Sequence, residues 1–340
     1  MKQSNLIALV IILFLPLLVK AQTNCVQNLR NARNLYEEGR LNELPELLSA
    51  CIESEFSKEE KVEALRLITL AHLYNENEAE AEAAFLKLLQ LEPEYRVDPA
   101  TEPAELVILK EKFDTDPKFS FGVKATQIIN FVQVMNRNVT LTNASPGTYE
   151  PSLNISFGAF FQYPFTKNLS ANVEVHYVGR VTSLERPILA EAGENRIQKV
   201  SESQQSFDVP LLINYKMPFK LFPVEITGGT ALHFLQSASL TLEGVGENRT
   251  NQDILPYRNT FNMSGVLGLR SEFKIIGRNY LSAEILYQHK LMNEVNLPSQ
   301  MDELQLDMQL RNGHSEFNYK AHSILIRVGI RIPYFKPQLK

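Results

Sequence analysis

Apolar and polar residues alternate along much of the chain after residue 118. In the last such stretch, residues 323–332, every second residue is isoleucine or valine, whereas the residues between them include Arg327 and Arg331. Successive side chains of a β-strand point to opposite faces, so this stretch predicts a strand with one apolar and one polar face. An apolar face that suits lipid, opposite a face that does not, is typical of a transmembrane β-barrel.

Eight stretches with this alternation predict eight antiparallel strands. They cover residues 119–134, 152–163, 169–181, 204–217, 224–236, 259–274, 279–292 and 319–334. Short turns at 164–168, 218–223 and 275–278 alternate with long polar connections at 135–151, 182–203, 237–258 and 293–318. Outer-membrane barrels have short turns in the periplasm and long loops outside. The pattern therefore predicts an eight-stranded transmembrane β-barrel over residues 117–336, with both chain ends in the periplasm.

The polar face of the predicted strands carries charges of both signs. Its ionisable residues are Lys124, Glu174, Arg180, Asp208, Lys216, Glu225, Arg270, Glu272, Glu284, Lys290, Arg327 and Arg331. The opposite register would expose Lys124, Lys216, Arg270, Arg327 and Arg331 to lipid together. This would cost on the order of 10 kcal/mol even with half of them near the edges, since each costs about 2 to 4 kcal/mol at the bilayer midplane. An eight-stranded barrel is just wide enough to be filled by its own side chains. We therefore expect a paired network that plugs the bore, with a water-filled path as the alternative.

Aromatic residues occur at both ends of the predicted strands, where amphipathic rings meet lipid headgroups. The ends beside the short turns carry Phe119, Tyr163, Tyr215, Phe273 and Tyr334. The ends beside the long connections carry Phe131, Tyr177, Phe207, Phe234, Phe261 and Tyr287. A water-soluble barrel would turn its apolar face inward, but an eight-stranded interior has no room for so many Phe, Tyr and Ile side chains.

Residues 22–115 have a different composition, rich in Glu, Leu and Ala. Helical spacing of their apolar residues predicts two helix hairpins and a further short helix. The helices are expected at 25–38, after Asn42, after Ser57, between Asn77 and Pro93, and after Thr101, with Ser57 and Glu60 forming a capping box. The expected fold class is thus α+β, with N-terminal helical hairpins followed by the barrel.

Residues 1–21 have the composition of a secretory signal peptide. Lys2 precedes an apolar run from Leu6 to Val19, and cleavage is expected after Ala21. A retained membrane anchor and a lipid-modified Cys25 are the alternatives. The apolar run is short for a membrane helix, because spanning takes about 20 residues.

Cys25 and Cys51 are the two cysteines of the chain. Cys25 opens one predicted helix and Cys51 closes the next, which places both at the open end of a helix pair. An exported protein matures in an oxidising compartment, so we predict a disulfide between them. A reactive thiol pair is the alternative, but the two residues lack CxxC spacing and a nearby histidine.

The second helix hairpin resembles a tetratricopeptide repeat. The positions that carry the resemblance are Leu65, Ile68, Ala81, Phe85, Leu88 and Pro93, which that motif uses to lock two helices together. His72 and Thr69 depart from the motif, at positions where an aromatic and a tiny residue are usual. The resemblance implies a surface that holds a peptide or protein, whereas a small helical cap that packs only on itself is the alternative.

The barrel segment resembles the PorT-like outer-membrane β-barrel family of Bacteroidota over about residues 119–335. The resemblance rests on the strand pattern, on SFDVPLLINY at residues 206–215 and on TGGTA at residues 227–231. It implies an outer-membrane location and no catalytic residues. The founding member of the family belongs to a protein-secretion machine. The helical segment lies outside the resemblance.

The chain carries no recognisable enzyme, cofactor or metal motif. Glu174 and His176 form a possible acid/base pair on the polar face, but no nucleophile accompanies them. The formal charge of -5 leaves no basic stripe for nucleic acid. We expect a non-enzymatic protein whose barrel contacts outer-membrane lipid and whose residues 22–115 bind another envelope protein in an assembly or secretion complex. A narrow solute pore and an adhesive barrel acting through its outer loops are the alternatives.

Overall fold

The computed structural model describes residues 25–54, 56–136, 147–189, 195–218, 223–244, 246–296, 303–312, 314 and 318–340. The predicted signal peptide, residues 1–21, lies outside the described residues. The chain divides into two compact units. Lys118–Tyr334 form one, and the chain up to Pro117 forms the other together with Phe335–Lys340.

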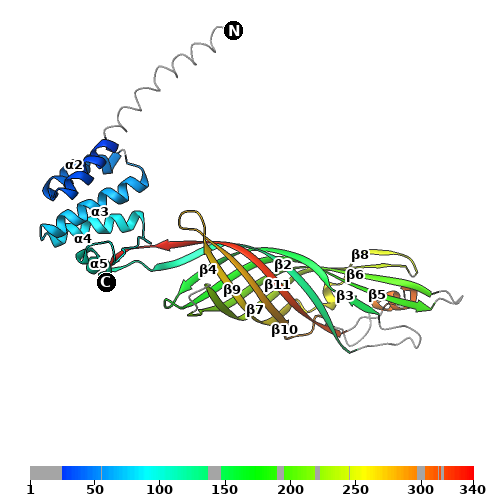
Figure 1. Cartoon of the computed structure of the whole chain (residues 1–340). Helices are drawn as coiled ribbons and strands as arrows, with labels where there is room; N and C mark the ends of the chain where they lie inside the picture. The colour runs from blue at the N-terminus through cyan, green and yellow to red at the C-terminus, as the bar shows by residue number, and fades with distance from the viewer. Residues whose placement is uncertain are drawn as a thin grey trace, which may run out of the picture. The chain divides into compact units, whose positions relative to one another are not determined.

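The first unit is helical. After helical residues 25–37 it contains η1 (Leu41–Glu43), α2 (Leu44–Ser54), α3 (Lys58–Tyr74), α4 (Glu78–Leu91) and α5 (Ala104–Glu111) (Figure 1). The predicted capping box at the start of α3 is confirmed: Ser57 Oγ accepts from the Glu60 N–H, and the Ser57 N–H donates to Glu60 Oε2 at 2.8 Å. Among the described residues, no helix has both the length and the apolarity to cross a membrane.

The helical unit contains the predicted disulfide, which joins Cys25 to Cys51 with 5.6 Å between their Cα atoms. Both cysteines are buried among Leu29, Leu48 and Ala64, so the bond is part of the core. A second cluster centres on the α3–α4 hairpin. The residues that resemble a helical repeat, Leu65, Ile68, Ala81, Phe85, Leu88 and Pro93, are all buried.

The C-terminus of the chain completes the helical unit. Strand β1 (Phe113–Asp114) pairs antiparallel with β12 (Gln338–Leu339), and the Lys340 N–H donates to the Lys112 carbonyl oxygen at 2.9 Å. The sequence did not predict this pairing, because two-residue strands are too short to show a period.

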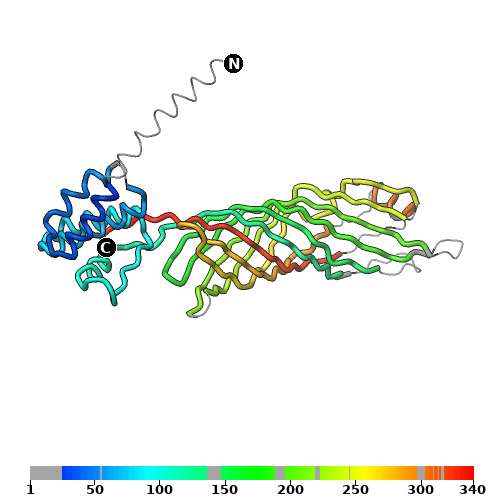
Figure 2. Tube along the Cα trace, turned by 45° about the horizontal axis from the view of Figure 1, so that its top comes forward, coloured from blue at the N-terminus to red at the C-terminus, as the bar shows by residue number. Residues whose placement is uncertain are grey.

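The second unit is built from long strands joined edge to edge. They are β2 (Pro117–Asn136), β4 (Ser152–Pro164), β5 (Leu169–Leu189), β6 (Asn195–Lys216), β7 (Val224–Glu243), β9 (Phe261–Lys274), β10 (Tyr280–Lys290) and β11 (Asn318–Phe335). Each strand pairs with the next in this order, and β11 also pairs with β2, so the sheet closes on itself as a barrel (Figures 1 and 2).

Three of the long connections expected from the sequence are largely ordered. Instead of a loop at 182–203, β5 and β6 continue as a hairpin whose pairing reaches Leu189 and Asn195. Within the expected loop at 237–258, β7 continues to Glu243, followed by β8 (Arg249–Asp253) and η2 (Leu255–Tyr257); α6 (Glu303–Asn312) lies within 293–318. β3 (Thr148–Glu150) pairs with β5, and residues 137–146 of the remaining connection lie outside the described residues.

These additions share a hydrophobic core, which we call the loop-end core. Its buried members are Leu184, Val200, Ala238, Leu240, Leu242, Ile254, Tyr257 and Met308. The opposite face of the extended strands carries Ser201, Ser239 and Lys199, which are half-buried or exposed. The expectation of polar loops was wrong because the alternation continues beyond the lipid band. There the inner face carries apolar residues together with the buried Gln198, Glu202 and Gln204, and the outer face is mostly polar.

Candidate functional site in the barrel interior

The outward face of the barrel is apolar, as the alternation predicts. On β11, Ile326 is 44% exposed and the neighbouring Arg327 is 4% exposed. The other outward residues of this strand, Ile324, Val328, Ile330 and Ile332, are also exposed. The predicted register is therefore confirmed on β11. Charged groups point inward and aliphatic groups outward.

Aromatic side chains lie at both ends of this apolar band. At the long-loop end, Tyr177, Phe207, Phe234 and Phe261 are cross-strand neighbours on β5, β6, β7 and β9. At the short-turn end, Phe119 stacks on Tyr334 with 4.7 Å between ring centroids. Beyond the long-loop row the outward face becomes polar, and a β-bulge falls between Gln205 and Ser206 at this boundary. The row thus marks where the surface changes from lipid-like to water-like.

The centre of the interior holds four fully buried ionic side chains, which we call the central ion cluster. Lys124 Nζ lies 2.6 Å from Glu174 Oε1 and 2.7 Å from Glu284 Oε1. Arg327 Nη1 lies 2.9 Å from Glu174 Oε2 and 3.7 Å from Glu284 Oε2. The four residues come from β2, β5, β10 and β11, so the cluster links strands that are far apart in the sequence.

Further ion pairs continue from the central ion cluster toward the short-turn end. Arg270 lies 3.5 Å from Glu284 Oε1 through Nε, is paired with Glu272, and approaches Glu225 Oε2 to 3.8 Å. Arg331 Nε lies 2.8 Å from Glu272 Oε1. Arg331 also donates to Ser120 at 3.0 Å and thus ties this group to β2.

A separate group of ion pairs lies toward the long-loop end. Arg180 Nη2 lies 2.5 Å from Asp208 Oδ2, which is also 2.9 Å from His233 Nδ1. Lys290 is paired with Glu294. The structure thereby brings Arg180, Asp208 and Lys290 into buried pairs, but it separates them from the central ion cluster.

Sequence reasoning missed one buried triad near the long-loop end. Arg258 Nε lies 2.7 Å from Glu202 Oε1, and the Tyr319 hydroxyl donates to Glu202 Oε2 at 3.1 Å. Glu202 and Arg258 lie within connections that were read as loops, so no inward face was assigned to them. The continued alternation around Glu202, with Val200 and Gln204 also buried, is the signal that could have located it.

Lys216 was expected among the interior charges but is exposed at the end of β6. His176 and Glu174, the possible acid/base pair, do come together, with His176 Nε2 2.9 Å from Glu174 Oε2. Both are at most 2% exposed, and the Glu174 carboxylate also accepts a hydrogen bond from Arg327. The pair is therefore a buried part of the ion network with no access for a substrate.

A belt of apolar side chains lies in the interior beside the two groups of charges. Its members are Ile128, Val178, Leu212, Ala231, Val266, Leu286 and Leu325, each from a different strand. The space beside the belt, lined by Thr126, His176, Asp208 and Arg327 among others, is about 10 Å³, which is at most one water molecule. An apolar constriction of this kind blocks ions by excluding water.

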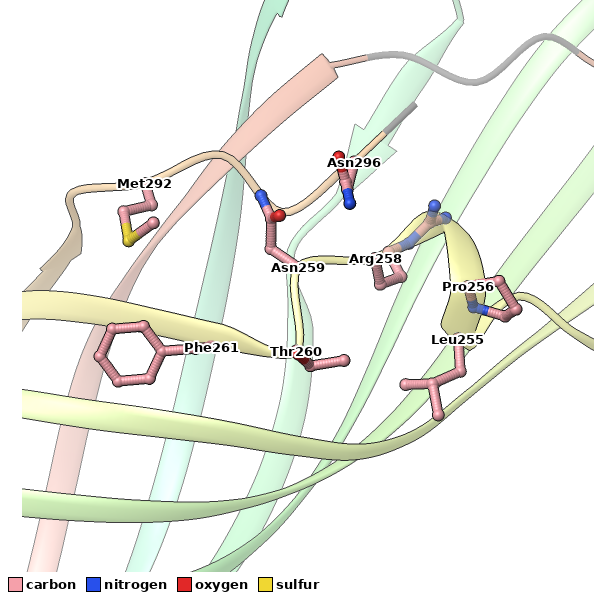
Figure 3. A pocket seen from close by; sticks show the side chains of 8 residues that line it. All are labelled: Leu255, Pro256, Arg258, Asn259, Thr260, Phe261, Met292 and Asn296. Atoms are coloured by element: carbon pink, nitrogen blue, oxygen red, sulfur yellow. The ribbon is translucent and has the colours of Figure 1, made fainter. Parts of the chain in front are cut away.

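A larger cavity lies outside the barrel interior, at the long-loop end. It measures about 510 Å³ and is lined by Leu255, Pro256, Arg258, Asn259, Thr260, Phe261, Met292 and Asn296 (Figure 3). Its polar walls are already engaged, since Asn259 Nδ2 donates to the Asn293 carbonyl at 2.7 Å and Arg258 is bound to Glu202. Within the described ranges, no three His, Cys, Asp or Glu side chains group as metal ligands.

The filled interior predicts that the protein is silent in a planar lipid bilayer. Replacing the belt residues Leu212, Leu286 and Leu325 together by serine should produce discrete single-channel steps, because the constriction becomes wider and wettable. A matched variant with serine at the outward-facing Leu211, Leu267 and Leu269 should stay silent. Single-channel current steps from the unaltered, correctly folded protein would contradict the assignment of the belt as a seal.

A family model described as the outer membrane protein beta-barrel domain matches residues 112–320. Neisserial surface protein A has a structure that covers 64% of this chain and 97% of its own, with 12% identity and a TM-score of 0.27. Ail, the attachment invasion locus protein of Yersinia pestis, covers 63% and 99%, with 10% identity and a TM-score of 0.29. OprG from Pseudomonas aeruginosa covers 65% and 98%, with 9% identity and a TM-score of 0.31. No curated protein matches the chain.

Proposed function

The chain belongs to the outer membrane protein β-barrel domain family, and on this basis we propose that its barrel is a non-enzymatic, non-conducting anchor for a periplasmic helical unit that binds another envelope protein. Membership of the family implies the bacterial outer membrane as its location. The observation that carries the anchor role is the filled interior, in which paired charges and an apolar belt leave about 10 Å³ beside the belt. A barrel of eight strands accounts for this filling, because it has little interior to spare.

A periplasmic position of the helical unit is supported by the connections of the barrel. The helical unit joins the barrel at the start of β2 and the end of β11, which is the end that carries the short turns. In outer-membrane barrels the short turns face the periplasm. The disulfide between Cys25 and Cys51 agrees with this compartment, because the periplasm is oxidising.

The helical unit has the features of a binding module rather than of a cap that packs only on itself. A cavity of about 300 Å³ on its surface is lined by Leu73, Glu76, Glu78, Glu105, Ile108, Leu109 and Lys112; we call it the helical groove. Ile108 is 61% exposed there, next to carboxylates. Hydrogen bonding from Lys112 lowers the pKa of Glu78, which stays ionised. A partner segment with basic residues beside an apolar one would fit this groove.

The charge of the helical unit points to the same kind of partner. Residues 25–117 and 335–340, which form this unit, contain 12 Lys and Arg against 21 Asp and Glu, a formal charge of -9. The whole chain carries only -5, so the negative charge is concentrated in this unit. Opposite charge steers association and suppresses wrong partners. We therefore infer that the partner presents a basic surface.

A PorT-like assignment within the family, and a repeat-like assignment for the helices, are part of the proposal. Residues 206–215 and 227–231, which carry the PorT-like resemblance, pair side by side on β6 and β7. A Cβ at Gly229 would lie 2.1 Å from the Leu211 carbonyl oxygen, so glycine is required where the two segments meet. The buried Leu65, Ala81, Phe85 and Leu88 support packing like that of a tetratricopeptide repeat. A secretion or assembly complex is the setting that these resemblances favour.

Affinity capture from detergent-solubilised membranes tests the proposed partner role. We expect a groove variant, Glu105→Lys with Ile108→Asp, to retain about tenfold less of the partner than the unaltered chain, because one binding determinant changes sign and the other becomes polar. The matched control on the same unit is Glu46→Lys with Val26→Asp, which should retain it fully. Partners that are still captured after residues 26–112 are deleted would contradict a binding role for the helical unit.

A further inference from the structure

Two histidines lie next to each other on the outward face of the barrel, at the long-loop end. His289 on β10 is the cross-strand partner of His322 on β11, and their ring centroids are 6.4 Å apart. His322 stacks on Phe131 at 5.4 Å, with 12° between the ring planes. His289 lies against Tyr287 at 6.4 Å and 17°. The aromatic rings therefore hold both imidazoles at the boundary between the apolar band and water.

A lysine extends this pair into a patch of three basic side chains. Lys320 is two residues from His322, so it lies on the same face of β11, one step farther toward the long-loop end. Lys320, His289 and His322 are all half-buried. We call His289, Lys320 and His322 the basic rim patch.

The surroundings of the basic rim patch contain no competing negative charge among the described outward positions. The outward residues next to it on β2 and β10 are Gln133, Met135 and Leu291. Below it, toward the short-turn end, the outward positions of β10 and β11 are aliphatic or aromatic, including Ile285, Ile324 and Ile326. The patch thus combines positive charge at the boundary with an adjoining apolar stripe in the lipid band.

We propose that the basic rim patch binds the phosphate of an outer-leaflet lipid, with an acyl chain of that lipid lying along Ile285, Ile324 and Ile326. The Lys320 ammonium and the imidazole N–H groups donate to phosphate oxygens, and hydrogen bonds to a charged acceptor are the stronger ones. The aromatic residues that contact the patch, Phe131 and Tyr287, place it at headgroup level, where such phosphates occur. A soluble anion would use the charges alone, whereas a lipid also uses the apolar stripe below them.

The choice of leaflet rests on the proposed orientation, with the short turns in the periplasm. The phosphate site itself rests on the barrel surface and does not depend on the helical unit. Loss of lipid binding and loss of protein capture are therefore separate results. If the lipid site is disproved, the proposed protein partner still stands, and the reverse also holds.

The test uses the full chain and counts retained lipid by native mass spectrometry. The protein is reconstituted into phosphatidylcholine nanodiscs that contain bisphosphorylated lipid A, or the same glycolipid without its phosphates, and is then released in mild detergent. We expect the unaltered chain to retain the phosphorylated glycolipid about tenfold better than a variant with His289→Gln, Lys320→Gln and His322→Gln. The variant has lost the charge-assisted hydrogen bonds to the phosphate. The dephosphorylated glycolipid should not distinguish the two proteins.

The control removes one lysine and one histidine elsewhere, through Lys199→Gln on the loop-end extension and His72→Gln on the helical unit. This control should retain lipid like the unaltered chain, and unheated gel mobility verifies that every barrel is folded. The proposal is overturned if the triple glutamine variant (the rim variant) retains the phosphorylated glycolipid as well as the unaltered chain does. It is also overturned if the unaltered chain retains the dephosphorylated glycolipid as well as the phosphorylated one. Full competition by inorganic phosphate would assign the patch to a free anion instead. Zinc binding lost in the rim variant, with lipid retention unchanged, would make it a metal site.

Discussion

Replacing Glu174 with glutamine should lower the free energy of unfolding of the barrel by about 3 to 5 kcal/mol. The Glu174 side chain is 0% exposed and accepts from Lys124 Nζ at 2.6 Å and from Arg327 Nη1 at 2.9 Å. Glutamine keeps the shape but not the charge, so Lys124 and Arg327 would keep only Glu284, which Arg270 also approaches. Breaking a buried pair in this way is costly because the remaining charge has lost its water as well as its partner.

Urea unfolding of the detergent-folded protein, followed by gel mobility without heating, measures this loss. The matched control is Glu185→Gln, which removes a pair with Lys199 whose side chains are 39% and 58% exposed. Such an exposed pair contributes about 0 to 1 kcal/mol, so the control should unfold like the unaltered chain. If Glu174→Gln also unfolds at the same urea concentration, the ion network does not support the barrel.

Replacing Cys25 and Cys51 by serine should destabilise the helical unit by about 3 to 4 kcal/mol. The disulfide closes a loop between residues 26 positions apart, and opening it restores conformational freedom to the unfolded chain. For a unit of this size the loss corresponds to a fall of about 12 to 30 °C in the melting temperature. Circular dichroism at 222 nm, where helices contribute strongly, follows this melting.

Reductant provides the internal control for this prediction. It should lower the melting temperature of the unaltered chain to that of the serine variant, and it should not change the variant further. The gel mobility of the barrel should be unaffected in both, because the disulfide lies wholly within the helical unit. A serine variant that melts at the same temperature as the unaltered chain would show that the bond contributes nothing to stability.

The register of the transmembrane strands was predictable because a lipid-facing surface imposes a strict choice at every second residue. On β11 the aliphatic side chains face outward and Arg327 faces inward, since the reverse arrangement would place a cation in hydrocarbon. The strand ends beside the lipid band were also close to the observed ones. β4, for example, spans Ser152–Pro164, against an expected 152–163.

The prediction failed where the same strands leave the lipid band. There the outward face meets water and carries Ser201, Ser239 and Lys199, while Leu184 and Leu240 turn into the loop-end core. A polar, serine-rich segment resembles a loop if a strand is recognised only by an apolar, lipid-facing side. Alternation alone, without regard to which face is apolar, would have extended β5, β6 and β7.

The interior site was predictable as a set of residues but not as a geometry. The sequence placed Lys124, Glu174, Glu284 and Arg327 on the inner face, yet the strand shear that decides which of them meet is a property of the closed barrel. The apolar belt was missed for a related reason. Leu212 and Leu325 lie on strand faces that are otherwise mostly polar, and only the closed sheet brings them together with Leu286.

The pairing of β1 with β12 has a consequence for how the molecule is made. Residues near position 113 leave the ribosome long before residues 338 and 339, so β1 can pair with β12 only after the barrel segment between them has been made. A product cut short by early termination would lack that closing strand. Formation of this small sheet therefore requires that synthesis has passed through the whole barrel segment.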